Sequence, residues 1–260
     1  MNFLQAIILG IVEGITEFLP ISSTAHLTLT AQLFGLAEID FVKSFIIIIQ
    51  LGAILPVTWL YLKRYATNWL VHQRVIIAFL PAAVIGFILY KLIKQFLLGN
   101  ITVMLWALAL GGIVLIVFEL YYRKRPTSLT NASSRIQDMS FKQALIVGCA
   151  QALAVVPGVS RSGATIISGL SLGLARSTIV EFSFILAVPT MAAATSYDLL
   201  KSAGSFSTDQ FGVLAVGFIV SAIFAQLSIT FLLNFVRKHT FIPFGIYRIV
   251  LAIIFALTLT

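Results

Sequence analysis

Long apolar segments make up most of this 260-residue chain, and they restrict the folds that it can adopt. Apolar residues account for 60% of the sequence and charged residues for only 10%, whereas a soluble globular domain is about 25% charged. Six segments are long enough to cross a hydrocarbon core of about 30 Å as helices. They run near 41–62, 74–93, 101–121, 178–199, 211–233 and 242–259. The sequence therefore predicts an all-α polytopic membrane protein with six transmembrane spans.

Two further apolar stretches, near 2–36 and 143–175, are each interrupted by a short polar cluster. Pro20 lies in the first interruption and Pro157-Gly158 in the second. Proline lacks a helix donor and disfavours helix at the residue before it. Irregular backbone is tolerated within a membrane only where it is buried in protein or lines a wet cavity. We therefore expect two re-entrant helical hairpins, each of which enters the bilayer and turns back.

The two polar clusters resemble each other. The first reads E-G-I-T-E-F-L-P-I-S-S-T-A-H and the second Q-A-L-A-V-V-P-G-V-S-R-S-G-A-T. A shift of 138 residues pairs Gly10 with Gly148, Glu13 with Gln151, Ser22 with Ser160, Ser23 with Arg161 and Thr24 with Ser162. This repetition predicts a single membrane domain built from two pseudo-repeats, approximately 1–122 and 141–260, which a polar cytoplasmic connection over 123–140 joins.

Basic residues in the loops predict the orientation. Eleven would lie on one side of the membrane: Lys63, Arg64, Arg74, Arg123, Lys124, Arg125, Arg135, Lys142, Arg176, Arg237 and Lys238. The opposite loops hold only Lys91, Lys94 and Lys201. An excess of Lys and Arg marks the cytoplasmic side, so the net charge of +8 indicates membrane topology and no nucleic-acid partner. The first hairpin then enters from outside and the second from the cytoplasm, which is an inverted-topology repeat.

The first cluster carries two carboxylates, Glu13 and Glu17, four residues apart and hence on one face of a helix. Two carboxylates this close in a site of low dielectric do not both stay ionised without a cation. Their oxygen ligands suit Mg²⁺ or Ca²⁺. A proton-sharing pair, or a polar contact between helices, is the alternative. Ionisable groups at membrane depth mark a functional site in either case.

Hydroxyl groups follow the first break, at Ser22, Ser23 and Thr24, and His26 comes shortly after them. A second helix that begins here would present free backbone N–H groups and hydroxyls, which together form an anion site. Ser23 and His26 are three residues apart and can be neighbours on a helix. The pattern permits a serine nucleophile with a histidine or a carboxylate as its base.

The second cluster adds a cation, Arg161, whose guanidinium matches the geometry of phosphate oxygens. The candidate phosphate ligands around it are Ser160, Ser162, Gly163 and Thr165. The alternative is a structural ion pair between Arg161 and one of the two glutamates. Carboxylates, hydroxyls, an imidazole and a guanidinium are the groups that phosphoryl transfer needs, because positioning and electrostatic stabilisation dominate that reaction.

Both clusters resemble the two signature motifs of the undecaprenyl-pyrophosphate phosphatase family, also called bacitracin-resistance proteins. The resemblance covers essentially the whole chain, with Ala25 in place of the glycine usual in the family. It implies a multi-pass enzyme of the bacterial cytoplasmic (inner) membrane that converts undecaprenyl pyrophosphate to undecaprenyl phosphate, the recycled cell-wall carrier lipid. It also implies a divalent cation and a site facing the periplasm or cell exterior. By motif position, Glu13 and Glu17 are the acidic pair, Ser23 and His26 the reacting hydroxyl and imidazole, and Arg161 the phosphate clamp.

Several alternatives stay open at this stage. The nucleophile is Ser23, His26 or a water molecule, and a homodimer is compatible with the sequence. A secondary transporter or lipid flippase is the rival function, since inverted repeats with broken helices are typical of transporters. Gln50 either lines the site or bridges helices, and bridging is the favoured interpretation. Glu181 and Arg248 are interpreted as a structural ion pair.

Overall fold

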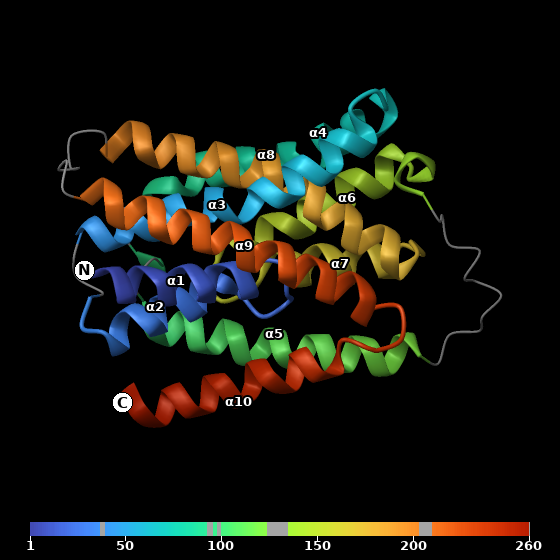
Figure 1. Ribbon diagram of the computed structural model, residues 1–260. Coiled ribbons are helices and arrows are strands. Elements are labelled where there is room, and N and C mark those ends of the chain that lie inside the picture. Colours follow the sequence, from blue (N-terminus) through green and yellow to red (C-terminus); the bar gives the residue numbers. More distant parts are fainter. Residues whose placement is uncertain (37–39, 93–95, 98–99, 124–134, 203–209, 260) are drawn as a thin grey trace.

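The computed structural model describes residues 1–36, 40–92, 96–97, 100–123, 135–202 and 210–259 (Figure 1). Within these ranges the chain forms ten α-helices, two short 3-10 helices and no strand. The α-helices are α1 (Phe3–Thr16), α2 (Ser23–Leu33), α3 (Asp40–Tyr65), α4 (Trp69–Leu92), α5 (Ile101–Tyr122), α6 (Phe141–Ala152), α7 (Arg161–Ser171), α8 (Arg176–Ser202), α9 (Phe211–Phe235) and α10 (Ile242–Leu259). The 3-10 helices are η3 (Ile136–Asp138) and η4 (Leu153–Val155). The prediction of an all-α chain is confirmed.

Five helices in the described ranges are long and apolar enough to cross a membrane: α3, α4, α5, α8 and α9. They lie within a few residues of five of the predicted spans. The sixth predicted span, α10, is a shorter apolar helix, as are α1 and α6. Many of the large apolar side chains on the long helices are exposed, for example Phe87, Trp106 and Ile219. Such helices are typical of a polytopic membrane protein, whose outer surface faces lipid.

The two interrupted stretches form helical hairpins, as predicted. Figure 1 shows α1 running from the end of the molecule that carries both termini toward its middle, and α2 returning to the same end. In the same view α6 and α7 form a hairpin that begins and ends at the opposite end. Pro20 and Pro157 lie in the connections between the paired helices. The breaks therefore bring two hairpin turns into the interior from opposite directions.

The same local devices shape both hairpins. A capping box of Asn2 with Gln5 begins α1, and one of Ser140 with Gln143 begins α6. These pairs are 138 residues apart, the same shift that aligns the two polar clusters. Directly before α2 and α7 lie two serines with positive φ, Ser22 at 70° and Ser160 at 76°, the only non-glycine residues of the described chain with this conformation. The sequence repeat thus corresponds to a repeat in backbone geometry.

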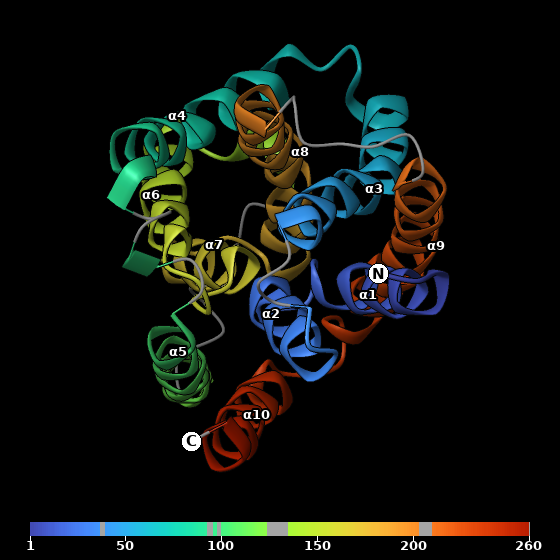
Figure 2. The same cartoon turned by 90° about the vertical axis from the view of Figure 1, so that its left-hand side faces the viewer.

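Each hairpin packs against a long helix from the other half of the chain. Figure 2 shows α1 against α9 on one side of the molecule and α6 against α4 on the other. Glycines make both approaches close: a Cβ at Gly10 would lie 2.7 Å from the carbonyl oxygen of Gly217, and one at Gly148 would overlap the carbonyl of Ala78. Between these pairs, α3 packs on α8 and α5 on α10. The main contact of each hairpin with the long helices is therefore with a helix of the opposite half.

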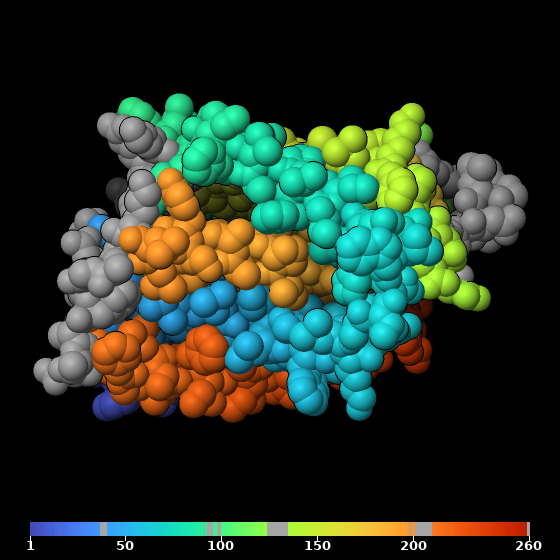
Figure 3. Space-filling view, turned by 90° about the horizontal axis from the view of Figure 1, so that it is seen from above, coloured from blue at the N-terminus to red at the C-terminus, as the bar shows by residue number. Residues whose placement is uncertain are grey.

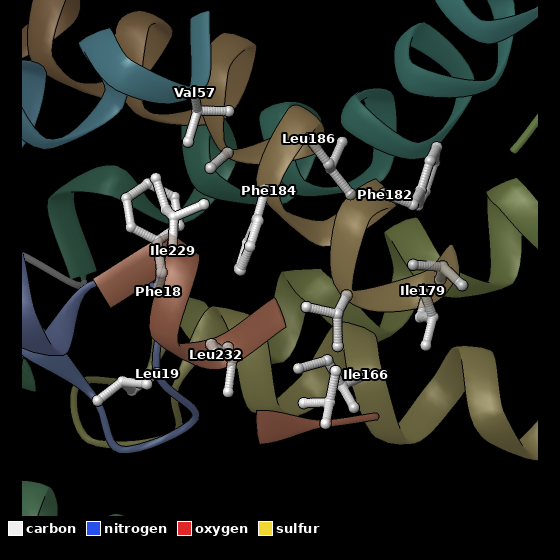
Figure 4. Close-up of a cluster of buried hydrophobic side chains, with 14 of the residues drawn as sticks. Phe18, Leu19, Val57, Ile166, Ile179, Phe182, Phe184, Leu186, Ile229 and Leu232 are labelled. Carbon is white, nitrogen blue, oxygen red and sulfur yellow. The ribbon is translucent and has the colours of Figure 1, made fainter. Parts of the chain in front are cut away.

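A buried apolar cluster fixes the first turn against the long helices (Figure 4). Phe18, in the α1–α2 connection, packs edge-to-face on Phe184 of α8 with ring centroids 5.1 Å apart. Val57 of α3 and Ile229 of α9 belong to the same cluster, and all four side chains are fully buried or nearly so. Edge-to-face aromatic pairs of this kind add about 1 kcal/mol beyond the area that they bury.

The loops with the most basic residues gather at one end of the molecule, where α3, α5, α7 and α9 end (Figure 1). Nine of the eleven basic residues predicted for this side fall in the described ranges, while Lys124, Arg125 and most of the 123–140 connection lie outside them. Lys94 also lies outside the described residues. Lys43, in the first turn of α3, adds one basic residue at the opposite end. Among the described residues, the end predicted to be cytoplasmic therefore still carries more basic residues than the opposite end.

Candidate active site

The turns of the two hairpins meet in the middle of the molecule. The Ser162 hydroxyl donates a hydrogen bond of 2.9 Å to the carbonyl of Leu19, which links the start of α7 to the α1–α2 connection. The Arg161 guanidinium donates through Nη2 to Oε1 of Glu17 at 3.0 Å. These contacts join residues more than 140 positions apart in the chain. The two polar clusters therefore form one site.

A cavity of about 140 Å³ lies between the turns. Six of the predicted site residues line it: Glu17, Ser22, Ser23, Thr24, Ser160 and Arg161. Gln50 of α3 and Met191 of α8 are also part of its wall. Bridging was the favoured interpretation of Gln50, but this side chain lines the site. Since α2 and α7 begin at Ser23 and Arg161, two helix N-termini border the same cavity, an arrangement that favours an anion.

Glu17 connects the two hairpins and orients both of their polar groups. Its Oε1 accepts the hydrogen bond from Arg161, and its Oε2 accepts a short hydrogen bond from the Ser23 hydroxyl. The side chains of Arg161 and Glu17 are only 11% and 9% exposed, so solvent screens this ion pair little. The Ser23 proton points at a carboxylate, which is the arrangement of a nucleophile with its general base.

Two hydrogen bonds hold the Arg161 guanidinium in place, and one of its N–H groups has no partner. Besides its bond to Glu17, its Nη1 donates to the carbonyl of Ser183 at 2.8 Å. Its Nε is buried and has no hydrogen-bond partner. The alternative of an ion pair with a glutamate is therefore realised, yet the guanidinium also borders the cavity. A guanidinium that is held in a fixed orientation at the cavity wall suits the binding of a phosphate oxygen.

His26 does not contact Ser23 in the manner that the sequence suggested. Its Nδ1 donates to the carbonyl of Ser22 at 2.8 Å, because a carbonyl can only accept, and its Nε2 lies 2.8 Å from the hydroxyl of Tyr247. The two rings stack with centroids 5.5 Å apart. Both ring nitrogens are thus engaged, and His26 is absent from the cavity wall. Its bond to Ser22 holds the one residue of this turn whose backbone conformation is strained.

Glu13 is the carboxylate with unused oxygens. It is fully buried, and neither of its carboxylate oxygens has a hydrogen-bond partner. A buried carboxylate in this state is costly without a cation or a proton. No group of three or more His, Cys, Asp or Glu side chains in the described parts of the chain could hold a metal ion. Mg²⁺, however, is often bound by one or two carboxylates together with substrate phosphates. Glu17 lines the cavity, and Glu13, one helical turn before it, is buried and is not part of the cavity wall.

The other predicted phosphate ligands hold the second turn together and do not line the cavity. The Gly163 N–H donates to the Ser160 hydroxyl at 3.2 Å and so caps α7. The Thr165 hydroxyl lies 2.7 Å from the hydroxyl of Ser183, whose carbonyl holds Arg161. Ser162 is buried against the first turn. These residues position Arg161.

Comparison with known proteins places this site in a family. The family model described as bacitracin resistance protein BacA matches residues 6–254. The chain belongs to this bacitracin resistance protein family. A relative in Aquifex aeolicus named undecaprenyl-diphosphatase is 49% identical over 252 residues, which cover 97% of this chain and 96% of the relative. Relatives with the same name in a Sulfurihydrogenibium species and in Wolinella succinogenes are 48% and 46% identical, with at least 97% of each chain covered.

One residue of this family member was misjudged from the sequence. Arg248 of α10 is 1% exposed and does not pair with Glu181, which instead accepts from Arg64 at 2.5 Å. The Arg248 guanidinium donates to five carbonyls, those of Pro20, Ala107, Leu108, Gly158 and Val159. It therefore joins both hairpin turns to α5. An arginine within an apolar helix indicated that Arg248 has a buried role. Its hydrogen-bond partners are backbone carbonyls, however, and these cannot be predicted from a pattern of side chains.

Proposed function

We propose that this chain is an undecaprenyl-diphosphatase that removes the terminal phosphate of undecaprenyl pyrophosphate and so returns the cell-wall carrier lipid to use, the reaction associated with bacitracin resistance. The names of its relatives at 46–49% identity over nearly the full chain support the activity. The observation that carries the site assignment is Glu17, one oxygen of which accepts from Ser23 and the other from Arg161.

In the proposed complex the pyrophosphate lies in the cavity between the hairpin turns. The Arg161 guanidinium, which borders the cavity, and the backbone N–H groups at the starts of α2 and α7 bind its oxygens. The Thr24 and Ser160 hydroxyls border the same space. This arrangement stabilises the charge that develops on the phosphoryl oxygens during transfer, which is the main contribution that a protein makes to this reaction.

Ser23 is the proposed nucleophile and Glu17 its base. The Ser23 oxygen forms a bond to the terminal phosphorus, the bond from that phosphorus to the bridging oxygen breaks, and undecaprenyl phosphate leaves. The Ser23 proton passes to Glu17, to which the hydroxyl already donates. Water then attacks the phosphoserine, phosphate leaves, and Glu17 returns the proton to Ser23. Direct attack by a water molecule at Glu17 is the second route.

His26 acts on the turn in this proposal and not on the phosphate. Its Nδ1–H holds the carbonyl of Ser22, and that residue determines where Ser23 begins α2. Tyr247 fixes the other side of the imidazole. A change at His26 therefore displaces Ser23 relative to Glu17, and displacements of about 1 Å can reduce a rate by about two orders of magnitude.

A divalent cation, Mg²⁺ or Ca²⁺, completes the site in this proposal. Glu13, both oxygens of which lack protein partners, would hold it together with Glu17 and the phosphate oxygens of the substrate. When bound, the ion would neutralise part of the negative charge of the pyrophosphate. The same ion would compensate the burial of Glu13.

We further propose that the chain has six transmembrane spans, α10 included, with the α1–α2 and α6–α7 hairpins re-entrant from opposite sides. The pseudo-repeats of about 1–122 and 141–260 then have inverted topology, which the shared capping boxes and positive-φ serines support. The basic end of the molecule faces the cytoplasm of a bacterium. From the resemblance to the family we expect the site to open to the outer side of the bacterial inner membrane.

The experiment that tests this function is phosphate release from undecaprenyl pyrophosphate by the purified full-length protein in detergent, with Mg²⁺ and with EDTA, alongside Arg161→Ala. We expect phosphate release that EDTA abolishes. In Arg161→Ala we expect the rate of release to fall by about 10²–10³-fold, because the variant lacks the guanidinium that stabilises negative charge in the transition state. If the folded wild-type protein releases no phosphate with added Mg²⁺ or Ca²⁺, the enzyme assignment is wrong and transport of the lipid becomes the better account.

A further inference from the structure

A second, larger hollow lies on the face of α5, next to the active-site cavity. It has a volume of about 450 Å³. Seven residues of α5 between Thr102 and Val114 line it, together with Val156 and Val159 from the α6–α7 connection. We call this the α5 groove. The α5 residues recur at spacings of three and four, so they form one face of the helix. From Thr102 to Val114, twelve steps along the helix, this face extends about 18 Å.

The α5 groove is apolar. Its lining consists of Val, Leu, Ala, Gly, Trp and Thr side chains, with no charged group among them. Trp106 and Leu110 are exposed by 64% and 54%. A hollow with this lining has no charged side chain that could bind a pyrophosphate or a metal ion. It suits a hydrocarbon chain, which it would contact on one flank while the other flank remained open to lipid.

The α5 groove and the active-site cavity share a wall. Val156 lines both hollows. Gly158, two residues on, packs on α5 so closely that a Cβ there would lie 2.5 Å from the carbonyl oxygen of Met104, and its φ of +96° is one that glycine adopts readily. Val159 of the groove directly precedes Ser160 of the cavity. The two hollows therefore adjoin each other at the α6–α7 connection.

The α6–α7 region is also reachable from the side of the molecule. Figure 3 shows a hollow in the lateral face between α8 and the teal-to-green segment, with atoms coloured as the α6–α7 region at its floor. Phe87 and Ile88 of the neighbouring α4 are 70% exposed, as expected of side chains that face lipid. This hollow is bounded by α8, which contributes no residue to the lining of the α5 groove, so it is a separate approach to the α6–α7 region.

From these contacts we infer that the α5 groove binds the part of the substrate's polyprenyl chain that lies nearest the pyrophosphate. This inference rests on the proposed phosphatase function, which supplies a substrate with one long apolar chain joined to a pyrophosphate. The groove orients that chain so that the pyrophosphate enters the cavity beside Arg161. The part of the chain nearest the pyrophosphate then takes part in substrate recognition through van der Waals packing, because lipid tails are as apolar as the groove and no transfer from water is involved.

The proposal is tested by substitutions that place a tryptophan side chain in the groove and so block it. Leu110→Trp places a large side chain in the groove, and Leu120→Trp is the matched control, because Leu120 is on the same helix, is 49% exposed and does not line the groove. Steady-state kinetics with undecaprenyl pyrophosphate give KM and kcat. The inhibition constant of isopentenyl pyrophosphate, which carries the pyrophosphate with almost no chain, reports on the cavity alone.

We expect Leu110→Trp to raise KM for undecaprenyl pyrophosphate about tenfold, with kcat and the inhibition constant of isopentenyl pyrophosphate within twofold of wild type. Leu120→Trp should leave all three values within twofold. If Leu110→Trp does not accumulate as folded protein, Val114→Trp fills the same groove, with Val117→Trp as its control.

Three results would overturn the inference. An unchanged KM for the long substrate means that the groove holds bulk lipid. An equal rise in KM and in the inhibition constant means that the substitution disturbs the cavity. A change of oligomeric mass on light scattering, with unchanged KM, means that the groove contacts a second copy of the chain. Failure of the proposed function itself is distinct, since the wild-type protein would then release no phosphate.

Discussion

The two hairpins have nearly the same backbone and carry different chemistry. Both begin with a capping box, approach their neighbouring helix through a glycine and turn at a serine of positive φ. Yet where the first hairpin has Glu13, Glu17, Ser23 and His26, the equivalent positions of the second are Gln151, Val155, Arg161 and Ala164. The first therefore supplies carboxylates and a hydroxyl, and the second supplies the cation. The repeat provides two converging helix N-termini, while the divergence of side chains provides the reaction.

The largest expected effect comes from Glu17, where the hairpins differ most. Glu17→Gln preserves shape but removes the proton acceptor of Ser23 and the negative partner of Arg161. We expect kcat for phosphate release to fall by about 10³-fold, since general bases contribute about 10²–10⁴. Val155→Ala, the change at the equivalent position of the second hairpin, should keep kcat within about threefold. Activity of Glu17→Gln within tenfold of wild type would contradict the assignment.

Glu13 and Gln151 distinguish a metal ligand from its neutral counterpart. Glu13→Gln gives the first hairpin the side chain that the second already has. We expect the Mg²⁺ concentration for half-maximal activity to rise by roughly tenfold or more, as is common when the shell around a metal is damaged. Gln151→Ala should leave the Mg²⁺ requirement unchanged. A titration of activity with Mg²⁺ checks both, and an unaltered requirement in Glu13→Gln would remove this residue from the metal site.

Arg248 tests whether the relative position of the two turns matters. Arg74 is a suitable control, because it is also a buried arginine bonded to carbonyls, those of Leu70 and Met139. Either change to Ala leaves buried carbonyls without donors, at about 1–3 kcal/mol for each unsatisfied group, so both should lower Tm. Only Arg248→Ala should also lower kcat, about tenfold to a hundredfold. Equal kcat values in the two folded variants would show that Arg248 serves stability alone.

Gly10 and Gly148 test the similarity of the hairpins, with the smallest effect on activity. An added methyl group at either position meets a backbone carbonyl of the opposing helix, and overpacking of this kind costs about 1–3 kcal/mol. Gly10→Ala and Gly148→Ala should therefore reduce Tm by similar amounts in thermal denaturation, with kcat of the folded protein preserved. A large difference between the two reductions would mean that the halves do not pack alike.

Some of the site could be predicted from sequence because its signals are local. The breaks at Pro20 and Pro157, the 138-residue shift and the polar groups within apolar sequence indicated two hairpins and brought Glu17, Ser23 and Arg161 together. The prediction of His26 as a neighbour of Ser23 relied on spacing alone. The partner of its Nε2 is Tyr247, 221 residues away, and no local pattern encodes that contact.

The burial of the second cluster also depends on geometry that the sequence does not display. Ser160 is not a glycine, so a positive φ was not indicated there, and this conformation determines which side chains of α7 face the cavity. As a result Arg161 lines the site, whereas Ser162 and Thr165 are buried in the contact between elements. The residue types predicted the chemistry of the cluster. Only the fold distinguished the residues that line the cavity from those that hold the turn in place.

The most direct test of the central claim, that Ser23 of the first hairpin attacks a phosphate held by the second, is the single-turnover rate of phosphate release by Ser23→Ala. The protein is incubated in excess over undecaprenyl pyrophosphate with Mg²⁺, and folding is verified by its Tm. We predict a rate at least about 10³-fold below wild type, because the nucleophile is absent while the phosphate clamp remains. A rate within tenfold of wild type would contradict the serine route and assign the attack to water.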